Sequence, residues 1–444
     1  MRGDLYCTIN AVDYNHSAMA TASLKTAHRK LISVLGSSTI LYLGHGLLTT
    51  LIGVRMSAEG FSPFSIGLIA SSFYVGGAVG SQLCNQVIRR VGHIRAFAIF
   101  SAVLATGSLA HALFLTPLAW VLIRALSGFS LYGLNVASES WLNATVTGNI
   151  RGRVLGTYMI LTFLALSMGQ LLLNTGDPAT FRLFSVSSML FALALIPMAL
   201  TQIPAPTSLA SEHLSIRRLY RISPLALVGS LASGMVIGTF LPLGSVYGAK
   251  IGLSTSEISL FMASGILGGL LLQWPIGALS DRHDRRVVIL AVAVGTTITA
   301  LLVGYLGYVS FSALLALTLL HGGLLNSIYP LSIAYGNDHI ESEDQFVELS
   351  RGLLLVYFIG ALVAPITGSL MMDPFGPIGL FLEIAVIAAL LAAFGLTRML
   401  RRASLPVEAQ EGYQTYGPYS STEVYELDPR YSDEPSPPPD EADK

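Results

Sequence analysis

Charged residues are scarce in this chain, and their scarcity decides its class. Only 11% of its 444 residues are Asp, Glu, Lys or Arg, whereas 52% are hydrophobic and the mean hydropathy is +0.64. A soluble globular domain devotes about a quarter of its residues to charge. The composition therefore excludes an ordinary soluble protein and indicates an integral membrane protein.

Several chemistries lack the residues that they need. Two cysteines, Cys7 and Cys84, cannot build a disulfide framework. The chain contains no G-x-x-x-x-G-K-[ST] loop for nucleotide phosphates, no Cys/His cluster with metal-ligand spacing, and no acid paired with a nucleophile. Charged rings typical of a channel filter are absent as well. We therefore expect no cofactor, no metal, no nucleic-acid partner and no enzymatic activity.

Long apolar runs are what the chain does have. A membrane-spanning helix needs roughly 20 predominantly apolar residues, and twelve segments reach that length. They are residues 31–54, 63–87, 94–115, 118–143, 153–175, 181–203, 224–248, 256–279, 286–307, 310–335, 352–372 and 376–399. The sequence thus predicts an all-α integral membrane protein with twelve transmembrane helices.

The basic residues predict the orientation of these helices. With both termini placed in the cytoplasm, only Arg55, Arg182 and Lys250 fall in outer loops, and Arg124 lies within a helix. All other Lys and Arg residues are then on the cytoplasmic side, where short loops are enriched in them. We therefore expect a multi-pass protein of the inner (plasma) membrane with both termini cytoplasmic.

The same pattern divides the chain into five parts. We expect a cytoplasmic arm that lacks the apolar stretch of a signal peptide, a first bundle of six helices, a cytoplasmic linker, a second bundle of six helices and a tail. The ranges are 1–30, 31–203, 204–223, 224–402 and 403–444. The tail holds ten acids against two bases, five tyrosines and the run Pro437-Pro438-Pro439, and we expect it to be disordered.

Two echoes indicate that the halves are repeats. The pair Gly76-Gly77 recurs 192 residues later as Gly268-Gly269, each followed by a basic cluster at the end of its apolar run. Arg151-Gly152 recurs as Arg351-Gly352, 200 residues on. Two pseudo-symmetric halves related by an axis along the membrane normal are a transporter plan, with the solute site between them near the midplane.

One loop carries a family resemblance. Residues 277–286, which read G-A-L-S-D-R-H-D-R-R, resemble the G-x-x-x-D-R-x-x-R-R loop between the second and third helices of each half in the major facilitator superfamily. An acid near a helix end can form a charge latch with such arginines, although the charges also satisfy the positive-inside rule alone. In the first half Arg89 replaces the acid and Asn85 replaces the glycine, so the pattern is degenerate there.

Further matches lie in the fourth and fifth helices. Arg124 to Gly128 resembles the R-x-x-x-G signature of proton-linked members. An arginine within a span is costly unless it faces a cavity, snorkels or has a partner. The series E-S-W-L-N from Glu139, R-G-R from Arg151 and G-Q-L-L from Gly169 resembles the YcaD-like branch of the superfamily. The fifth helix lacks the glycine-proline signature usual in antiporters.

The resemblance and the charges together predict a cytoplasmic gate. Its members are glycines, arginines and acids at helix ends near the predicted cytoplasmic side. They are Arg89, Arg90, Gly92, Arg95, Glu139, Arg151, Arg153, Gly277, Asp281, Arg282, Arg285 and Arg286. We expect Glu139 to meet Arg151 or Arg153 and hold that loop, with a proton-carrying role as the alternative.

Polar residues deep in the apolar runs predict the solute and proton pathway. They are His45, Arg124, Asn135, Gln170, Gln273, His321, Asn326 and Tyr329. Polar groups away from water need hydrogen bonds, which a wet cavity or a neighbouring helix can provide. His45 and His321 rank first for proton coupling because histidine titrates near neutrality.

These features predict a major facilitator fold and a secondary active transporter that moves a small organic solute by alternating access, linked to protons. Its partners would be the solute, the lipid bilayer and protons, and we expect a monomer. The alternatives are a proton-coupled exporter of drugs or metabolites and a non-transporting membrane sensor or scaffold that signals through the tail.

Overall fold

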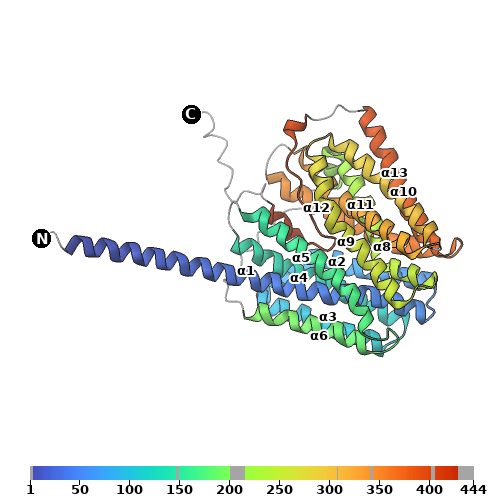
Figure 1. Ribbon diagram of the computed structural model, residues 1–444, viewed down its shortest axis with the longest axis horizontal. Helices are drawn as coiled ribbons and strands as arrows, with labels where there is room; N and C mark the ends of the chain where they lie inside the picture. The colour runs from blue at the N-terminus through green and yellow to red at the C-terminus, as the bar shows by residue number, and fades with distance from the viewer. Residues whose placement is uncertain are drawn as a thin grey trace.

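The computed structural model describes residues 4–146, 150–200, 216–307, 309–340, 344–401 and 406–428, and residues 4–30 as backbone only. This part of the chain is built from helices and loops without a strand (Figure 1). Twelve of its helices are long and apolar enough to cross a membrane, by length and composition. The twelve spans predicted from the sequence are therefore confirmed.

The spans form two sets of six. The first set is α1 (Asp4–Ala58), α2 (Pro63–Val91), α3 (His93–Leu113), α4 (Pro117–Thr145), α5 (Arg151–Leu171) and α6 (Arg182–Ala199). The second set is α8 (Pro224–Lys250), α9 (Thr255–Ser280), α10 (Arg285–Leu306), α11 (Phe311–Asn337), α12 (Asp344–Met371) and α13 (Gly379–Arg401). Short 3-10 turns extend α5 (η2, Leu172–Thr175) and precede α13 (η3, Gly376–Ile378).

Local sequence explains where several helices begin. Ser62 and Ser223 cap α2 and α8 through their side-chain oxygens, and each is followed by a proline at the first helical position. Proline suits that position because its missing N–H would have no partner there. Ser254 and Glu257 form a reciprocal capping box at the start of α9. These caps fix the turns between spans.

Close glycine packing repeats in both bundles. A Cβ on Gly76 of α2 would lie 1.8 Å from the Ala125 carbonyl oxygen of α4, and one on Gly268 of α9 would lie 1.9 Å from the Leu319 carbonyl oxygen of α11. Each glycine therefore lets its helix touch the backbone of the helix two spans later. The double glycines seen in the sequence mark equivalent crossings, which supports the repeat.

We call the end of the bundle where the span of α1 begins and α13 ends the terminal face, and the opposite end the far face. The two bundles meet through α1 with α8, α2 with α12, and α5 with α9. Gly53 packs on Ser245, Gly67 on Ser369, and Ser167 donates a hydrogen bond to the Ala263 carbonyl. These contacts lie in the half of the molecule nearer the far face, so the bundles are joined there.

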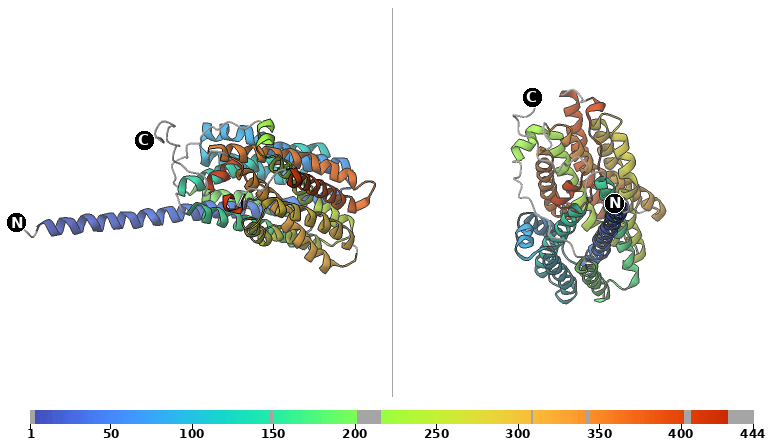
Figure 2. Two further views of the ribbon diagram at one scale, coloured as in Figure 1. Left: turned by 90° about the horizontal axis from the view of Figure 1, so that it is seen from above. Right: turned by 90° about the vertical axis from the view of Figure 1, so that its left-hand side faces the viewer.

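Helix α1 starts well before its membrane span. Its backbone is helical from Asp4, and the first part projects beyond the bundles (Figures 1 and 2). Residues 4–30 of the predicted arm thus continue the first span. Of the predicted linker, residues 216–222 form the short helix α7 (Ile216–Ile222), which buries Leu219 against Gly352 of α12; residues 204–215 lie outside the described residues.

The prediction of a disordered tail over residues 403–444 is wrong for residues 406–428. This segment folds back from α13 into the terminal face, through η4 (Val407–Ala409) and η5 (Thr422–Leu427). Tyr416, Tyr419, Tyr425, Glu423 and Asp428 become buried there, and side chains of both bundles supply hydrogen-bond and ion-pair partners for the segment. Residues 403–405 and 429–444 lie outside the described residues.

Candidate functional site

A cluster of rings lies where the two bundles face each other, midway along the spans. The Tyr419 ring meets the His45 ring edge-on at 4.7 Å between centroids, and the Phe73 ring at 6.0 Å. His45 in turn stacks on Phe73 at 5.5 Å. Helices α1 and α2 thus present an aromatic wall, and the tail residue Tyr419 is seated against it.

Arg124 of α4 adds a positive charge to this cluster. Its guanidinium carbon lies 4.3 Å from the centroid of the Phe73 ring, and the side chain is 4% exposed. Within the part of the chain that the structure describes, its Nε and Nη1 atoms have no hydrogen-bond partner. Buried donors normally have partners, so these N–H groups are available to a ligand.

Asn135 links α1, α4 and the tail. Its side-chain oxygen accepts a hydrogen bond from the Tyr42 hydroxyl at 3.1 Å, and its amide nitrogen donates to the Tyr419 carbonyl at 2.5 Å. Both capacities of the amide are therefore used, one within the first bundle and one on the tail. A cavity of about 20 Å³ remains between α2, α4, α12 and Tyr419, about enough for one water molecule.

Glu139 lies nearer the terminal face of α4 and is fully buried. Its Oε1 accepts from the Tyr158 hydroxyl at 3.1 Å, and its Oε2 accepts from the backbone nitrogen and the hydroxyl of Ser421 at 3.0 and 2.5 Å. The hydrogen bonds on its two oxygens thus come from α5 and the tail. The sequence predicted that Glu139 meets Arg151 or Arg153. Arg151 is buried and Arg153 is exposed.

The second bundle holds the other side of the tail. The hydroxyls of Tyr329 and Tyr425 are 2.5 Å apart, and Arg351 forms an ion pair with Glu426 at 3.2 Å. Tyr357 donates a hydrogen bond to the Pro418 carbonyl at 3.2 Å. Tail residues therefore bond to α11 and α12 as well as to α4, and they pack against α1 and α5.

Charged residues of the predicted gate form ion pairs in the second bundle, which we call the charge latch, and Asp338, which sequence reasoning missed, takes part in them. Arg285 pairs with Asp281 at 3.0 Å and with Asp338, the residue that follows α11, at 2.6 Å. The side chains of Arg285 and Asp338 are 1% and 2% exposed. Arg286 pairs with Asp284, and Arg282 is exposed. The latch therefore joins α9, α10 and α11.

The gate residues of the first half are arranged differently. Arg89 and Arg90 at the end of α2, and Arg95 at the start of α3, are exposed at the terminal face. Gly92 has φ +83°, a conformation that favours glycine, and makes the turn between these helices. In the second half, Gly277, which aligns with Asn85 of the first half, faces the Tyr413 ring, which a Cβ would approach to 2.2 Å. Among the residues that the structure describes, the second-half loop therefore combines a charge latch with a tail contact.

Four predicted pathway residues lie away from the Tyr419 cluster. Gln170 accepts a hydrogen bond from Thr50 between α5 and α1, and Gln273 donates one to the Asn326 carbonyl between α9 and α11. Asn326 donates to Gly322 of its own helix. His321 hydrogen-bonds Thr299 and packs beside Phe240 and Phe381 inside the second bundle. For Gln170, Gln273 and His321, the hydrogen-bond partner is thus a neighbouring helix, which was the alternative to a wet cavity.

Glu383 of α13 is a buried carboxyl that the sequence analysis passed over. Its oxygens accept hydrogen bonds from Thr239 of α8, at 3.2 Å, and from Thr367 of α12. It lies in the far half of the second bundle, and a Cβ on Gly368 would collide with it. An acid inside an apolar run was the signal that could have identified it.

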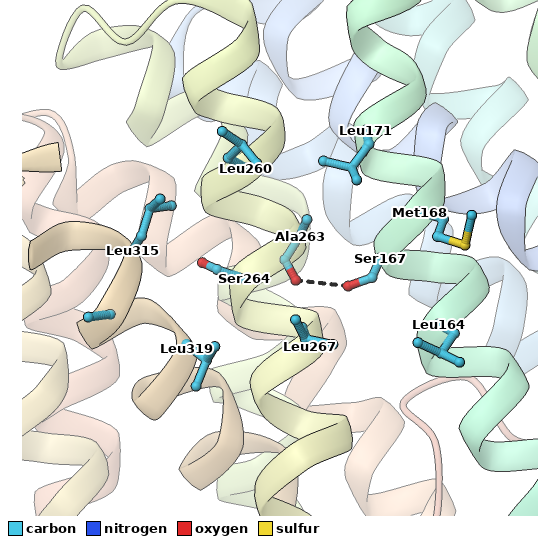
Figure 3. Close-up of a pocket in the computed structure, with 11 residues that line it drawn as sticks. Leu164, Ser167, Met168, Leu171, Leu260, Ala263, Ser264, Leu267, Leu315 and Leu319 are labelled. Carbon is cyan, nitrogen blue, oxygen red and sulfur yellow. Dashed lines mark hydrogen bonds between the residues drawn. The ribbon is translucent and has the colours of Figure 1, made fainter. Parts of the chain in front are cut away.

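A separate pocket lies on the outer surface of the seam between the bundles. It measures about 440 Å³ and is lined mainly by leucines of α5, α9 and α11 (Figure 3). The Ser167 hydroxyl and the Ala263 carbonyl join across the seam at 2.8 Å. Met168, which lines the pocket, is 59% exposed. This pocket thus faces the apolar surroundings of the bundle, whereas the Tyr419 cluster lies inside.

Two six-helix bundles joined near one face, with a polar and aromatic site between them, define the class of secondary membrane transporters. The model of the Major Facilitator Superfamily matches residues 34–268 and 225–423. The chain belongs to this superfamily. Within the described residues no group of three or more His, Cys, Asp or Glu side chains is placed to hold a metal ion.

Curated relatives place the chain in the YcaD-like branch. It is 27% identical over 381 residues to the uncharacterized MFS-type transporter YcaD of Escherichia fergusonii, covering 85% of this chain and 98% of the relative. The YcaD of Shigella flexneri is 26% identical over 367 residues, covering 82% of this chain and 94% of the relative. The resemblance stated from the sequence is therefore confirmed.

Solved structures support the fold. A point mutant of the nucleoside transporter NupG aligns with a TM-score of 0.73 at 14% identity, covering 83% of this chain and all of NupG. A bacterial homologue of the human lysosomal transporter Spinster, in an inward-facing and unoccupied conformation, aligns with a TM-score of 0.64 at 14% identity, covering 92% of this chain and 99% of the homologue. Both likenesses extend over the two bundles.

Proposed function

We propose that the protein transports a small organic solute by alternating access, linked to protons, across the bacterial inner membrane with both termini in the cytoplasm. The excess of Lys and Arg in the loops of the terminal face supports this orientation. The observation that carries the proposal is Arg124, a buried cation with unpartnered N–H groups between two bundles that are joined toward the far face. A buried charge of this kind favours a partner that accepts its hydrogen bonds, and a bound solute would supply one.

The walls of the site favour a solute with a ring and an acceptor group. Phe73 and His45 offer aromatic faces and edges, which bind rings at centroid distances of about 4.5 to 7 Å. Arg124 and Asn135 offer N–H donors. An aromatic acid has both a ring and an acceptor group, and so does a nucleoside. Nucleosides are the solutes that the structural neighbour NupG transports. Tyr419 of the tail has both features as well: its ring contacts His45 and Phe73, and its carbonyl accepts a hydrogen bond from Asn135.

Uptake by proteoliposomes tests the proposal. Radiolabelled uridine, benzoate, lactate and glucose serve as probes, with the purified protein in the membrane and an inward proton gradient. We expect uptake of a ring-bearing probe, and a loss of about tenfold or more in Arg124→Gln because one hydrogen bond to a charged group contributes roughly 1.5 to 3 kcal/mol. Arg182→Gln, at the far face and exposed, is the matched control.

The histidines test the coupling. His45 lies in the site, whereas His321 lies inside the second bundle. If His45 carries the coupled proton, His45→Ala abolishes gradient-driven uptake and leaves solute counterflow intact. In that case uptake by His321→Ala stays coupled to the proton gradient. Wild-type proton coupling in His45→Ala would show that His45 does not carry the coupled proton.

A further inference from the structure

The tail segment is held as a ligand is held, through its main chain. Five of its backbone groups deep in the site bond to side chains of the helices. The Pro418 and Tyr419 carbonyls accept from Tyr357 and Asn135, and the Glu423 carbonyl accepts from Asn143. The amides of Ser421 and Thr422 donate to Glu139 and Tyr132. Backbone recognition by many separate side chains is the mark of a built peptide site.

Three more backbone groups bond at the terminal face, and they bond to the charge latch. The Glu411 amide donates to Asp338 at 3.1 Å, and the Glu411 carbonyl accepts from Arg285 at 2.6 Å. The Tyr413 amide donates to Asp281 at 3.0 Å. The acids and the arginine that tie α9, α10 and α11 together therefore also hold the tail where it enters.

The burial of the segment excludes a loose surface contact. Tyr416, Val424, Tyr425 and Leu427 are at most 2% exposed. Glu423 is 4% exposed, and its carboxylate lies near Asn85 of α2 and is attracted by Arg351 of α12. The segment thus lies between the two bundles and keeps them apart at the terminal face.

We propose that residues 411–428 are a tethered plug that docks in the solute site of this same chain and must leave before solute enters. This inference rests on the proposed function, because it makes Tyr419 an occupant of the site between His45, Phe73 and Asn135. With the plug in place the solute cannot reach Arg124 from the terminal face. The plug also blocks the approach of α4 and α5 to α11 and α12 that alternating access requires.

Cysteine labelling tests the plug without a known solute. Leu131 lines the small cavity beside Tyr419 and is 2% exposed. Leu131→Cys is placed in a Cys7→Ser, Cys84→Ser background, and its reaction with a small maleimide is measured in detergent. Three chain lengths are compared: the full chain, a chain ending at Asp428, and a chain ending at Arg401. We expect equal slow rates in the first two and a rate at least tenfold higher in the third.

A peptide and point variants guard against misfolding of the shortest chain. A synthetic peptide of residues 406–428 restores slow labelling of that chain, and a scrambled peptide does not. In the full chain, Tyr419→Ala combined with Ser421→Ala accelerates labelling, whereas Glu408→Ala, which alters an exposed residue, does not. Equal labelling in all three lengths, or no acceleration in the double variant, overturns the plug.

Uptake separates this inference from the proposed function. Faster labelling of the shortest chain, without uptake of any of the four probes, supports the plug and counts against transport. Uptake at equal rates by the full and shortest chains supports transport and overturns the plug. We expect uptake by the shortest chain to exceed that of the full chain and of the chain ending at Asp428.

Discussion

Ser421 donates two hydrogen bonds to one oxygen of Glu139, from its backbone nitrogen at 3.0 Å and from its hydroxyl at 2.5 Å. The carboxyl is fully buried in α4, and a buried charge without partners destabilises a membrane protein strongly. The tail therefore supplies bonds that Glu139 needs, and Glu139 in turn holds the start of η5, for which Ser421 is the N-cap.

This pair predicts the effect of Ser421→Ala in the full chain. The variant loses a hydroxyl that bonds to a carboxyl, which contributes roughly 1.5 to 3 kcal/mol. We expect the labelling rate of Leu131→Cys to rise about tenfold or more, since about 1.4 kcal/mol is a factor of ten. Glu408→Ala is the control. An unchanged rate in Ser421→Ala would show that this hydroxyl does not hold the tail.

Docking of the tail should depend on pH through Glu423. Burial raises the pKa of the Glu423 carboxyl in the docked tail, although the Arg351 guanidinium opposes the shift. A carboxyl with a raised pKa stabilises docking below its free value of about 4.3, and this contribution is lost as pH rises through the docked value. Asn85 and Thr422, and the titratable side chains of Glu139 and Tyr132, also lie near it.

We therefore expect the labelling rate of Leu131→Cys to increase with pH, measured relative to the exposed Glu408→Cys to cancel the titration of the thiol. Glu423→Gln should flatten this ratio because it removes the titrating group. A ratio that falls with pH, or the same slope in Glu423→Gln, would assign the pH dependence to another group.

The buried latch predicts a difference in stability between two acids. Asp338→Asn leaves Arg285, 1% exposed, without its buried partner, and breaking such a pair costs about 3 to 5 kcal/mol. Asp281→Asn changes a side chain that is 37% exposed, so we expect about 1 kcal/mol or less. Thermal unfolding in detergent should show a much lower midpoint for Asp338→Asn alone. Equal midpoints would contradict the central position of Asp338.

Helix packing predicts the outcome of two glycine substitutions. Gly76→Ala places a Cβ 1.8 Å from the Ala125 carbonyl oxygen and must push α2 away from α4, at a cost of about 1 to 3 kcal/mol. Gly156 of α5 has nothing within 4 Å of an added Cβ, so Gly156→Ala should be neutral or stabilise by about 0.4 to 1 kcal/mol. Thermal unfolding distinguishes the two. Equal midpoints would argue against close contact at this crossing.

The fold could be predicted from the sequence because its determinants are local. A run of about 20 apolar residues specifies a span regardless of distant residues. The repeated glycines identified the bundle crossings, and His45, Arg124 and Asn135 do lie together at the Tyr419 cluster. Each of these signals was contained within one helix.

The tail could not be predicted in the same way. Its acids, prolines and low hydrophobicity match a segment that buries too little apolar surface to fold alone. Its structure depends on partners about 280 residues away, such as Asn135 for Tyr419 and Asn143 for Glu423, and on main-chain bonds that leave no side-chain pattern. Asp338 was missed for a related reason, because only the packing of α11 brings it to Arg285.

The position of the plug at the carboxyl end sets an order of events during biosynthesis. Residues 411–428 leave the ribosome after all twelve spans. In each newly made copy the solute site is therefore open when the spans insert, and it closes only after residues 411–428 have been made and have docked. A premature stop codon between codons 402 and 411, which removes the plug and keeps all twelve spans, would thus yield an unregulated carrier instead of an inactive one.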